Sequence, residues 1–278
     1  MKLAVLSGKG GAGKTMLSVN LAAAAGDSLY NDCDVEEPNG RLFLKPEQVT
    51  EERVLVELPE FIADRCTGCR KCVDFCRFNA LVYIRRKPMV FSDVCHSCGG
   101  CALVCPEQAV YKTFRQVGKV EHGMHGSTRV VTGELKLGAA SGVPVIHQAL
   151  SAMDGFDGFT VIDCPPGSAC SVMESVGQAD YCLLVAEPTA FGFHNFCMVH
   201  ELARLMGKPC GVVVNKMDAP YPPLEEYCKE QGLPILMRIP YSEHTAGLCA
   251  AGKLLCEEDP AEAERFRCLL EQIGGAVQ

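Results

Sequence analysis

The chain has 278 residues, which suits one large domain or two ordinary ones, and 48% of them are apolar. This composition supplies a sizeable core and excludes a chain that is disordered throughout. The 26 basic and 34 acidic residues leave a net charge of −8, so we expect neither nucleic acid nor an anionic membrane as a partner. No apolar run approaches the roughly 18 residues that a membrane-spanning helix needs, which favours a soluble protein.

Cysteine is unusually frequent, with eighteen in the chain, which is several times ordinary usage. The first residues, Met1 to Gly8, lack the long apolar stretch and the cleavage site of a signal peptide. We therefore expect a cytoplasmic protein. In a reducing compartment, so many cysteines indicate metal ligation or redox chemistry rather than structural disulfides.

The first predicted elements are a buried strand over Lys2–Leu6, a glycine-rich loop over Ser7–Thr15, and a helix that runs toward Ala25. Strand, loop and helix follow in the order that a phosphate-binding P-loop requires. Glycines let the backbone N–H groups wrap around phosphates. Lys14 is expected to reach the β- and γ-phosphates, and Thr15 to offer its hydroxyl to Mg²⁺. The predicted nucleotide-binding residues of the loop are Gly8, Gly10, Gly11, Ala12, Gly13, Lys14 and Thr15.

A second lysine in the loop, Lys9, indicates which class of P-loop proteins the chain resembles. The string from Lys9 to Thr15 resembles the deviant Walker A motif of the MinD/ParA/Mrp class of ATPases, which includes the nitrogenase iron protein. In that class the early lysine crosses a nucleotide-sandwiched dimer and contacts the phosphates bound by the partner. The resemblance implies that Lys9 acts in this way, so the protein would be catalytically complete only as an ATP-bound dimer.

An acidic segment follows a short predicted strand over Ser28–Tyr30 and stands where the family has switch I. The resemblance implies that Asp34 orients the attacking water and that Asp32 belongs to the magnesium shell. The alternative for both residues is a loop that carries ordinary turn acids.

Eight of the cysteines form two runs with the same C-x2-C-x2-C-x3-C spacing, which indicates a duplicated unit. The first run is Cys66, Cys69, Cys72 and Cys76, and the second is Cys95, Cys98, Cys101 and Cys105. The pattern resembles the bacterial ferredoxin with two 4Fe-4S clusters, in which the fourth cysteine of each run binds the other cluster. The resemblance therefore implies that Cys105 completes the first cluster and Cys76 the second. The alternative is structural zinc.

Two further features concern the cysteine-rich segment. Pro106 follows Cys105 as in the ferredoxin family, but Arg77 follows Cys76 where proline is usual, and this should alter the packing beside that ligand. Residues 60–116 carry nine basic and five acidic side chains. Because an oxidised cluster with its four thiolates is anionic, two clusters would offset most of this basic excess.

A later predicted strand over Phe159–Asp163 ends in a carboxylate and is followed by Cys164-Pro165-Pro166-Gly167. A carboxylate at the end of a parallel strand beside the P-loop is suitably placed to hold Mg²⁺. Asp163 thus resembles the Walker B residue, and the Gly167 amide is expected to sense the γ-phosphate as part of switch II.

Two more predicted strands end in residues that are expected to contact the adenine base. The strand Gly211–Val214 leads into Asn215, which resembles the asparagine that reads the adenine edge in the family; the alternative is a strand-end turn. Pro240 follows a predicted strand over Ile235–Ile239 and is expected to flank the base, although a proline that simply ends a strand fits as well.

The remaining elements alternate between strands and helices: a strand over Tyr181–Ala186, helices near 193–206 and 223–231, and terminal helices. This order predicts an α/β fold with a mainly parallel, doubly wound P-loop NTPase sheet, interrupted by a small α+β ferredoxin domain. The predicted domains are a discontinuous ATPase domain, 1–58 and 117–278, and a ferredoxin domain, 59–116. Six glycines within 117–142 suggest mobile connections.

Other candidate ligands carry weaker signals. His122 and His125 form either a metal site or part of a flexible glycine loop. Cys33, Cys164 and Cys170 lie in or beside the predicted switches, where they either hold an additional cluster at the dimer seam or act as small apolar side chains. The chain lacks the C-P-x-C pair of Mrp-type cluster carriers.

Together the motifs predict a dimerising ATPase similar to MinD and Mrp, with ATP, Mg²⁺ and two 4Fe-4S clusters as cofactors. Its dimer partner is a second copy or a similar ATPase. ATP binding and hydrolysis are expected to drive either electron transfer to a redox client or assembly of a metal cluster in a client protein. The alternative is an ATP-controlled partner-binding switch whose clusters are structural or sense redox state. The tail from Pro260 lacks the basic amphipathic anchor of a membrane-binding helix.

Overall fold

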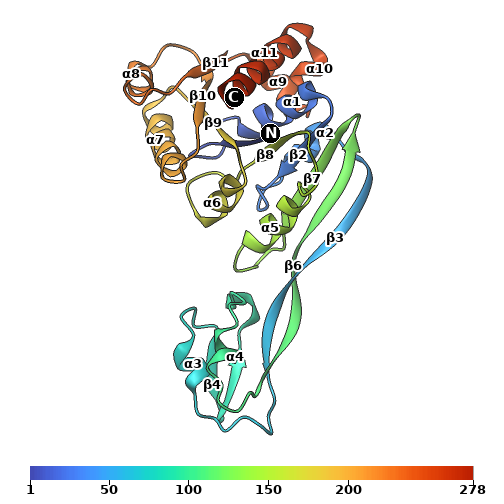
Figure 1. Cartoon of the computed structure of the whole chain (residues 1–278), viewed down its shortest axis with the longest axis vertical. Coiled ribbons are helices and arrows are strands. Elements are labelled where there is room, and N and C mark those ends of the chain that lie inside the picture. Colours follow the sequence, from blue (N-terminus) through green and yellow to red (C-terminus); the bar gives the residue numbers. More distant parts are fainter. Residues whose placement is uncertain (278) are drawn as a thin grey trace.

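The computed structural model describes residues 1–277 and consists of a large α/β body and a smaller lobe, joined by two long strands (Figure 1). The body is built on one nine-stranded sheet. In spatial order its strands are β11 (Ile235–Pro240), β10 (Cys210–Met217), β9 (Tyr181–Ala186), β1 (Lys2–Leu6), β8 (Phe159–Asp163), β2 (Ser28–Asp32), β7 (Thr128–Leu135), β6 (Val110–His125) and β3 (Glu47–Phe61). All neighbours from β11 to β7 are parallel, whereas β6 is antiparallel to both β7 and β3. The predicted mainly parallel α/β sheet is therefore confirmed.

Helices cover both faces of the sheet, which explains why the central strands are continuous apolar runs. One face packs against α1 (Lys14–Ala25), α2 (Gly40–Leu44), α9 (Glu243–Ala250), α10 (Leu255–Glu258) and α11 (Pro260–Val277). The other packs against α5 (Val143–Ser151), α6 (Cys170–Gly177), α7 (Ala190–Leu205) and α8 (Pro222–Glu230). Alternate side chains of β1 enter the two cores, because successive residues of a strand point to opposite faces. None of the helices within residues 1–277 combines the length and the apolarity needed to cross a bilayer.

The boundaries of the body elements follow local chemistry. The strands Lys2–Leu6 and Phe159–Asp163 lie where the sequence predicts them. Helix α7 begins at Ala190, three residues earlier than predicted, because the Thr189 side chain caps it by accepting a hydrogen bond from the Gly192 N–H at 3.0 Å.

The prediction of mobile connections over 117–142 is wrong for most of that segment, because β6 and β7 form an ordered antiparallel pair there. Its glycines serve close packing. A Cβ added to Gly118 would lie 2.5 Å from the Glu134 carbonyl oxygen, and one added to Gly133 would lie 2.7 Å from Cγ1 of Val35. Glycine is required at these positions since any side chain would displace a neighbouring element.

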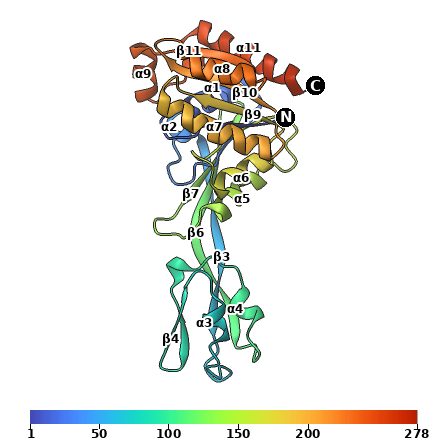
Figure 2. The ribbon, with the colours of Figure 1, turned by 90° about the vertical axis from the view of Figure 1, so that its left-hand side faces the viewer.

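The lobe comprises the residues between β3 and β6. It contains α3 (Lys71–Phe75), a two-stranded sheet of β4 (Leu81–Ile84) and β5 (Lys87–Val90), a 3₁₀ turn (Ser92–Val94) and α4 (Gly100–Leu103). These elements make a small α+β unit. Figure 2 shows that it stands apart from the body on the β3–β6 ribbon.

The ribbon carries the lobe toward the carboxyl edge of the sheet. Pairing of β3 with β6 extends from Glu47 opposite Met124 to Phe61 opposite Val110, whereas β7 stops at Leu135, opposite Gly118. The segments 55–61 and 110–116 therefore project beyond the carboxyl end of β7. The predicted domain boundaries, after residue 58 and before residue 117, fall inside these two continuous strands.

Candidate functional site

A cavity of about 850 Å³ opens at the carboxyl edge of the sheet, beyond the ends of β1, β2 and β8. Its walls come from the P-loop and the start of α1, from the segment after β2, from residues 141–143, and from the segment after β8. A cavity of this size is in the range of sites for ligands as large as a nucleotide. The edge where carboxyl ends of parallel strands meet is also where doubly wound sheets bind such ligands.

The P-loop backbone has the shape and polarity of a phosphate cradle. Gly11 and Gly13 have φ values of +78° and +96°, in the left-handed region that glycine enters without a Cβ penalty. Beside Gly10 and Gly11 there is open space, so phosphate oxygens can approach the backbone closely. Helix α1 begins directly after Gly13, and the positive end of its dipole faces the cavity. The loop therefore fits a nucleotide phosphate.

Lys14 is the cation at the centre of a buried acidic cluster. Its Nζ lies 2.9 Å from Oδ1 of Asp163 and 3.5 Å from Oδ2 of Asp34, and only 6% of its side chain is exposed. Burial on its own lowers the pKa of Lys14, but the carboxylates of Asp163 and Asp34 outweigh it, so the pKa is raised and the amine stays charged. The sequence did not predict that Tyr30 also binds this cluster: its hydroxyl donates to Oδ2 of Asp163 at 2.9 Å.

Asp32 lies under the segment predicted as switch I. Its two carboxylate oxygens accept hydrogen bonds from the backbone N–H groups of Asp34 at 3.2 Å and Gly40 at 2.9 Å. The side chain is fully buried, and burial, with Asp163 beside it, raises the pKa of Asp32 to about 8. In this structure Asp32 fixes the path of the following loop; its predicted place in a magnesium shell stays a prediction.

Lys9 forms an ion pair with Glu187, and its amine lies 5.5 Å from the centre of the Phe191 ring. Oε1 of the same glutamate lies 2.9 Å from Nζ of Lys216, which also donates to the Gly11 carbonyl at 2.6 Å. Burial works to raise the pKa of Glu187, but the two lysines lower it overall, so the carboxylate is ionised. The sequence reasoning missed Glu187 and Lys216, although Glu187 directly follows β9 at the same sheet edge where Asp163 ends β8.

Two of the residues predicted to read the base and the γ-phosphate, Asn215 and Gly167, contact the P-loop. The Asn215 side-chain N–H donates to the Ala12 carbonyl at 2.8 Å, and the Gly167 N–H donates to the Ser7 carbonyl at 3.0 Å. Pro240 ends β11 opposite Met217. None of Asn215, Gly167 and Pro240 is among the residues that line the 850 Å³ cavity. Their contacts with nucleotide stay predictions.

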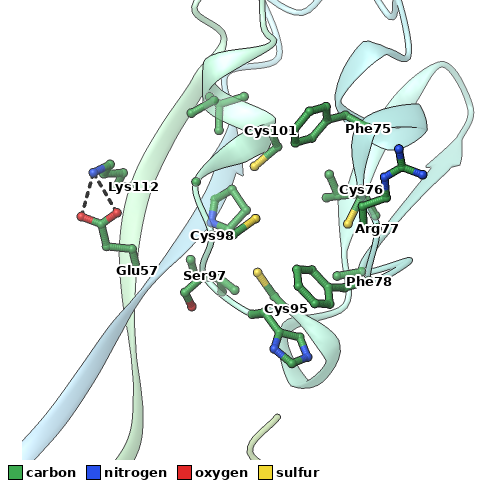
Figure 3. Close-up of a pocket in the computed structure, with 18 of the residues that line it drawn as sticks. Glu57, Phe75, Cys76, Arg77, Phe78, Cys95, Ser97, Cys98, Cys101 and Lys112 are labelled. Atoms are coloured by element: carbon green, nitrogen blue, oxygen red, sulfur yellow. Dashed lines mark hydrogen bonds and ion pairs between the residues drawn. The ribbon is translucent and has the colours of Figure 1, made fainter. Parts of the chain in front are cut away.

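The eight cysteines of the lobe are grouped around two cavities in a crossed arrangement. One cavity is lined by Cys66, Cys69, Cys72 and Cys105. The other is lined by Cys95, Cys98, Cys101 and Cys76, and Figure 3 shows the sulfurs of the second run along one wall with Cys76 on the opposite wall, between Phe75 and Phe78. Each cavity thus takes three cysteines from one run and the fourth from the other.

The thiols of the lobe are unpaired, with no disulfide among the cysteines of residues 1–277. Burial raises the pKa of Cys101 to about 11 and also raises that of Cys72. Within the same residues there is no group of three or more His, Cys, Asp or Glu side chains suited to hold one metal ion. A 4Fe-4S cluster is bound differently from a single metal ion, because its four thiolates bind four different iron atoms and surround the cluster rather than converge on one point. The binding of two clusters by the crossed cysteine sets stays a prediction.

The other candidate ligands do not form sites together. His122 and His125 are three residues apart on β6, so they face opposite sides of the strand, and Nε2 of His125 lies 2.9 Å from Oε1 of Glu257. Cys33 and Cys164 are fully buried, and burial raises the pKa of both thiols. Their burial favours packing as small apolar side chains. Cys170 is exposed and lines the 850 Å³ cavity.

Comparison with known proteins agrees with this architecture. Residues 3–255 match the family model described as CobQ/CobB/MinD/ParA nucleotide binding domain. The uncharacterized protein MJ0578 of Methanocaldococcus jannaschii is 29% identical over 281 residues, which cover 98% of this chain and 96% of that protein. The solved septum site-determining protein MinD of Pyrococcus horikoshii, complexed with Mg-ADP, has a TM-score of 0.61 at 19% identity and covers 98% of this chain and 95% of its own. The ATP complex of a Cyanothece McdA variant has a TM-score of 0.60 at 16% identity, with 98% and 96% covered. At these identities the solved structures share the fold.

Proposed function

Because the chain belongs to the CobQ/CobB/MinD/ParA nucleotide-binding domain family, we propose that it is an ATP-hydrolysing switch that works as a dimer and carries two 4Fe-4S clusters in its lobe. The observation that carries the ATPase is the P-loop lysine, Lys14, whose amine lies 2.9 Å from the strand-end carboxylate of Asp163 at the 850 Å³ cavity. A phosphate-binding amine beside a magnesium-binding carboxylate is the core of a P-loop ATPase site.

The residues of the site divide the work of hydrolysis. The backbone from Gly8 to Gly13 and the start of α1 bind the phosphates, and Lys14 moves from Asp163 to the β- and γ-phosphates. Thr15, Asp163 and Asp32 would hold Mg²⁺, which would supply positive charge to neutralise the phosphates. Asp34 accepts a hydrogen bond from the attacking water and orients it. Gly167 reads the γ-phosphate, while Asn215 and Pro240 border the base.

The dimer is supported by Lys9 and by exposed apolar side chains at the same sheet edge. Phe191 beside Lys9, Met173 on α6 and Leu137 after β7 are 65%, 45% and 99% exposed. A second copy, or a similar ATPase, would cover them when two carboxyl edges meet around ATP. Lys9 then leaves Glu187 and contacts the nucleotide of the partner.

The clusters are supported by the crossed cysteine cavities. We assign the first cluster to Cys66, Cys69, Cys72 and Cys105, and the second to Cys95, Cys98, Cys101 and Cys76. This assignment makes residues 59–116 a ferredoxin domain inserted between the ATPase segments 1–58 and 117–278. It rests on the fact that each cavity is lined by four cysteines and by apolar side chains, Phe61 and Pro88 in the first and Phe75 and Phe78 in the second, which limit the access of water to a cluster.

The predicted switch I segment contacts β7 close to the point where β6 leaves the body toward the lobe. A movement of switch I on ATP binding is transmitted to the lobe through these contacts. The Val35 carbonyl accepts a hydrogen bond from the Leu135 N–H at 2.8 Å, and the adjacent Lys136 N–H donates to the Val117 carbonyl of β6 at 2.8 Å. The methyl groups of Val35 pack against Gly133 and Gly142. Val35 directly follows Asp34, so binding or loss of the γ-phosphate shifts Val35. This shift alters β6 around Val117 and hence the position of the lobe.

The output of this switch is electron transfer to a redox client, or assembly of a metal cluster in a client protein. A second function has support of its own, because a solved MinD of Aquifex aeolicus forms a complex with MinC. By analogy, this chain would be a partner-binding switch in which ATP controls association and the clusters are structural or sense redox state.

Anaerobic purification and site variants test the proposal. We expect about eight iron atoms per chain and visible charge-transfer absorption; two zinc atoms without that absorption would refute the clusters.

Lys14→Ala should abolish ATP binding, whereas Lys9→Ala should retain ATP binding and lose ATP turnover. Full turnover of the Lys9 variant would exclude action in trans. A client captured only with ATP is then assayed for reduction and for gained iron, and a client that shows neither favours the partner-binding switch.

A further inference from the structure

The hairpin that β4 and β5 form in the lobe has three consecutive basic residues at its turn, Arg85, Arg86 and Lys87. All three are exposed, and none forms an ion pair with another side chain within residues 1–277. Unpaired charge at the tip of a short hairpin is fully available to an external anion.

The backbone of this turn is unusual for its residues. Ile84 pairs with Lys87, so Arg85 and Arg86 form a two-residue turn, with φ values of +49° and +65°. A turn with two left-handed residues favours Asn-Gly, because other side chains are strained there. Two arginines therefore occupy positions where the fold itself would favour other residues, which points to a use for their charge.

The turn lies against the loop that carries the first run of cysteines. The Tyr83 hydroxyl donates to the Gly68 carbonyl at 2.7 Å, and the Arg86 carbonyl oxygen lies 3.0 Å from the position of a Cβ on Gly68. The Arg70 guanidinium lies 5.1 Å from the centre of the Tyr83 ring. We call Arg70, Lys71, Arg85, Arg86 and Lys87 the basic face.

The charge of the basic face contrasts with the rest of the chain. Residues 62–109 hold seven of the 26 basic residues but only four of the 34 acidic ones. Asp74, whose carboxylate lies 3.8 Å from Arg70, and Glu107, which lines the same cavity as Arg70 and Lys71, offset part of this charge, and the five basic side chains keep a positive balance. The lobe thus presents positive charge beside one cysteine cavity, while the acidic residues are concentrated in the body.

We propose that the basic face docks a protein whose own one-electron centre is surrounded by carboxylates, and that one electron passes from the reduced cluster at Cys66, Cys69, Cys72 and Cys105 to that centre. The electron transfer rests on the proposed function; the docking surface does not. No bond forms or breaks: the cluster is oxidised by one electron and the partner's centre is reduced by one. Docking at the hairpin brings the partner's centre next to the cluster because Tyr83 and Arg86 contact the cysteine loop.

The test compares two small one-electron carriers of opposite charge, acidic flavodoxin and basic cytochrome c. The photochemically reduced protein is mixed with each carrier in a stopped-flow instrument, and oxidation of the clusters is followed by absorbance. With flavodoxin we expect a rate constant that falls steeply from about 50 to about 500 mM salt. In the variant Arg85→Gln/Arg86→Gln/Lys87→Gln it should be about tenfold lower at low salt and nearly independent of salt. With cytochrome c the same variant should react no more slowly than the unmodified protein.

A matched control removes the same number of charges at the other end of the molecule, from α8 to α11 (Figure 1). It is Lys229→Gln/Lys253→Gln/Arg267→Gln, three exposed residues of the body. Its rate constant with flavodoxin should equal that of the unmodified protein. A second hairpin variant, Arg85→Asn/Arg86→Gly, suits the left-handed turn and so guards against misfolding; it should also slow flavodoxin severalfold.

Binding of labelled flavodoxin, measured by fluorescence anisotropy, separates the two proposals. If hairpin variants and control bind and react with flavodoxin equally, the basic face is not a docking site. If the protein contains no iron, the clusters of the proposed function are refuted, and the docking surface still stands or falls on whether the hairpin variants bind flavodoxin more weakly than the control.

Discussion

The contact between Val35 and Gly133 permits a quantitative test of the route from switch I to the lobe. Val35 is 3% exposed, and Val35→Ala removes two buried methyl groups, which we expect to lower the free energy of unfolding by about 2 kcal/mol. Gly133→Ala places a methyl group 2.7 Å from Cγ1 of Val35 and 3.2 Å from Cγ1 of Val145. Valine has little rotamer freedom with which to move aside, so overpacking should cost about 1 to 3 kcal/mol.

The double variant distinguishes direct packing from two independent effects. Alanine at 133 would occupy the space that Val35→Ala vacates, so the combined loss should be smaller than the sum of the single losses by at least about 1 kcal/mol. Urea unfolding of the four proteins measures this coupling. Hydrogen exchange at residues 110–117, with and without a non-hydrolysable ATP analogue, measures whether the ribbon responds to nucleotide. Strictly additive losses, or a ribbon that responds equally to nucleotide in Val35→Ala and in the unmodified protein, would refute the route.

Three further predictions concern single groups. Tyr30→Phe leaves a buried oxygen of Asp163 without its donor and should cost about 1 to 3 kcal/mol in urea unfolding; a variant as stable as the unmodified protein would contradict the role of this hydroxyl. Burial lowers the pKa of His200, whose Nδ1 lies 2.8 Å from the Tyr227 hydroxyl, so below about pH 6.5 the unfolded chain binds a proton first and stability falls with falling pH. His200→Gln should reduce that slope, and an identical slope would exclude His200 as its source. Cys105→Ser should lower the iron content from about eight toward about four atoms per chain, and unchanged iron would argue against the crossed ligand set.

The sequence by itself determined the elements whose signals are local. The apolar run Lys2–Leu6 and the glycine loop that follows it specify a strand and a phosphate cradle, because burial pattern and backbone freedom are properties of neighbouring residues. The resemblance of the two cysteine runs to the bacterial ferredoxin implied which fourth cysteine belongs with which run, and the cavities group the cysteines in the same way.

Only the tertiary structure decided which distant residues meet. Tyr30 reaches Asp163, and Glu187 binds Lys9, because β2, β8, β9 and β1 become neighbours in the sheet, an order that no local pattern encodes. The glycines at 118 and 133 indicated mobility in the sequence, yet they lie in the paired strands β6 and β7, where an added Cβ would lie 2.6 Å from Cγ2 of Val145 and 2.7 Å from Cγ1 of Val35, respectively. A glycine required by close packing and a glycine in a flexible loop look the same until the opposing element is known.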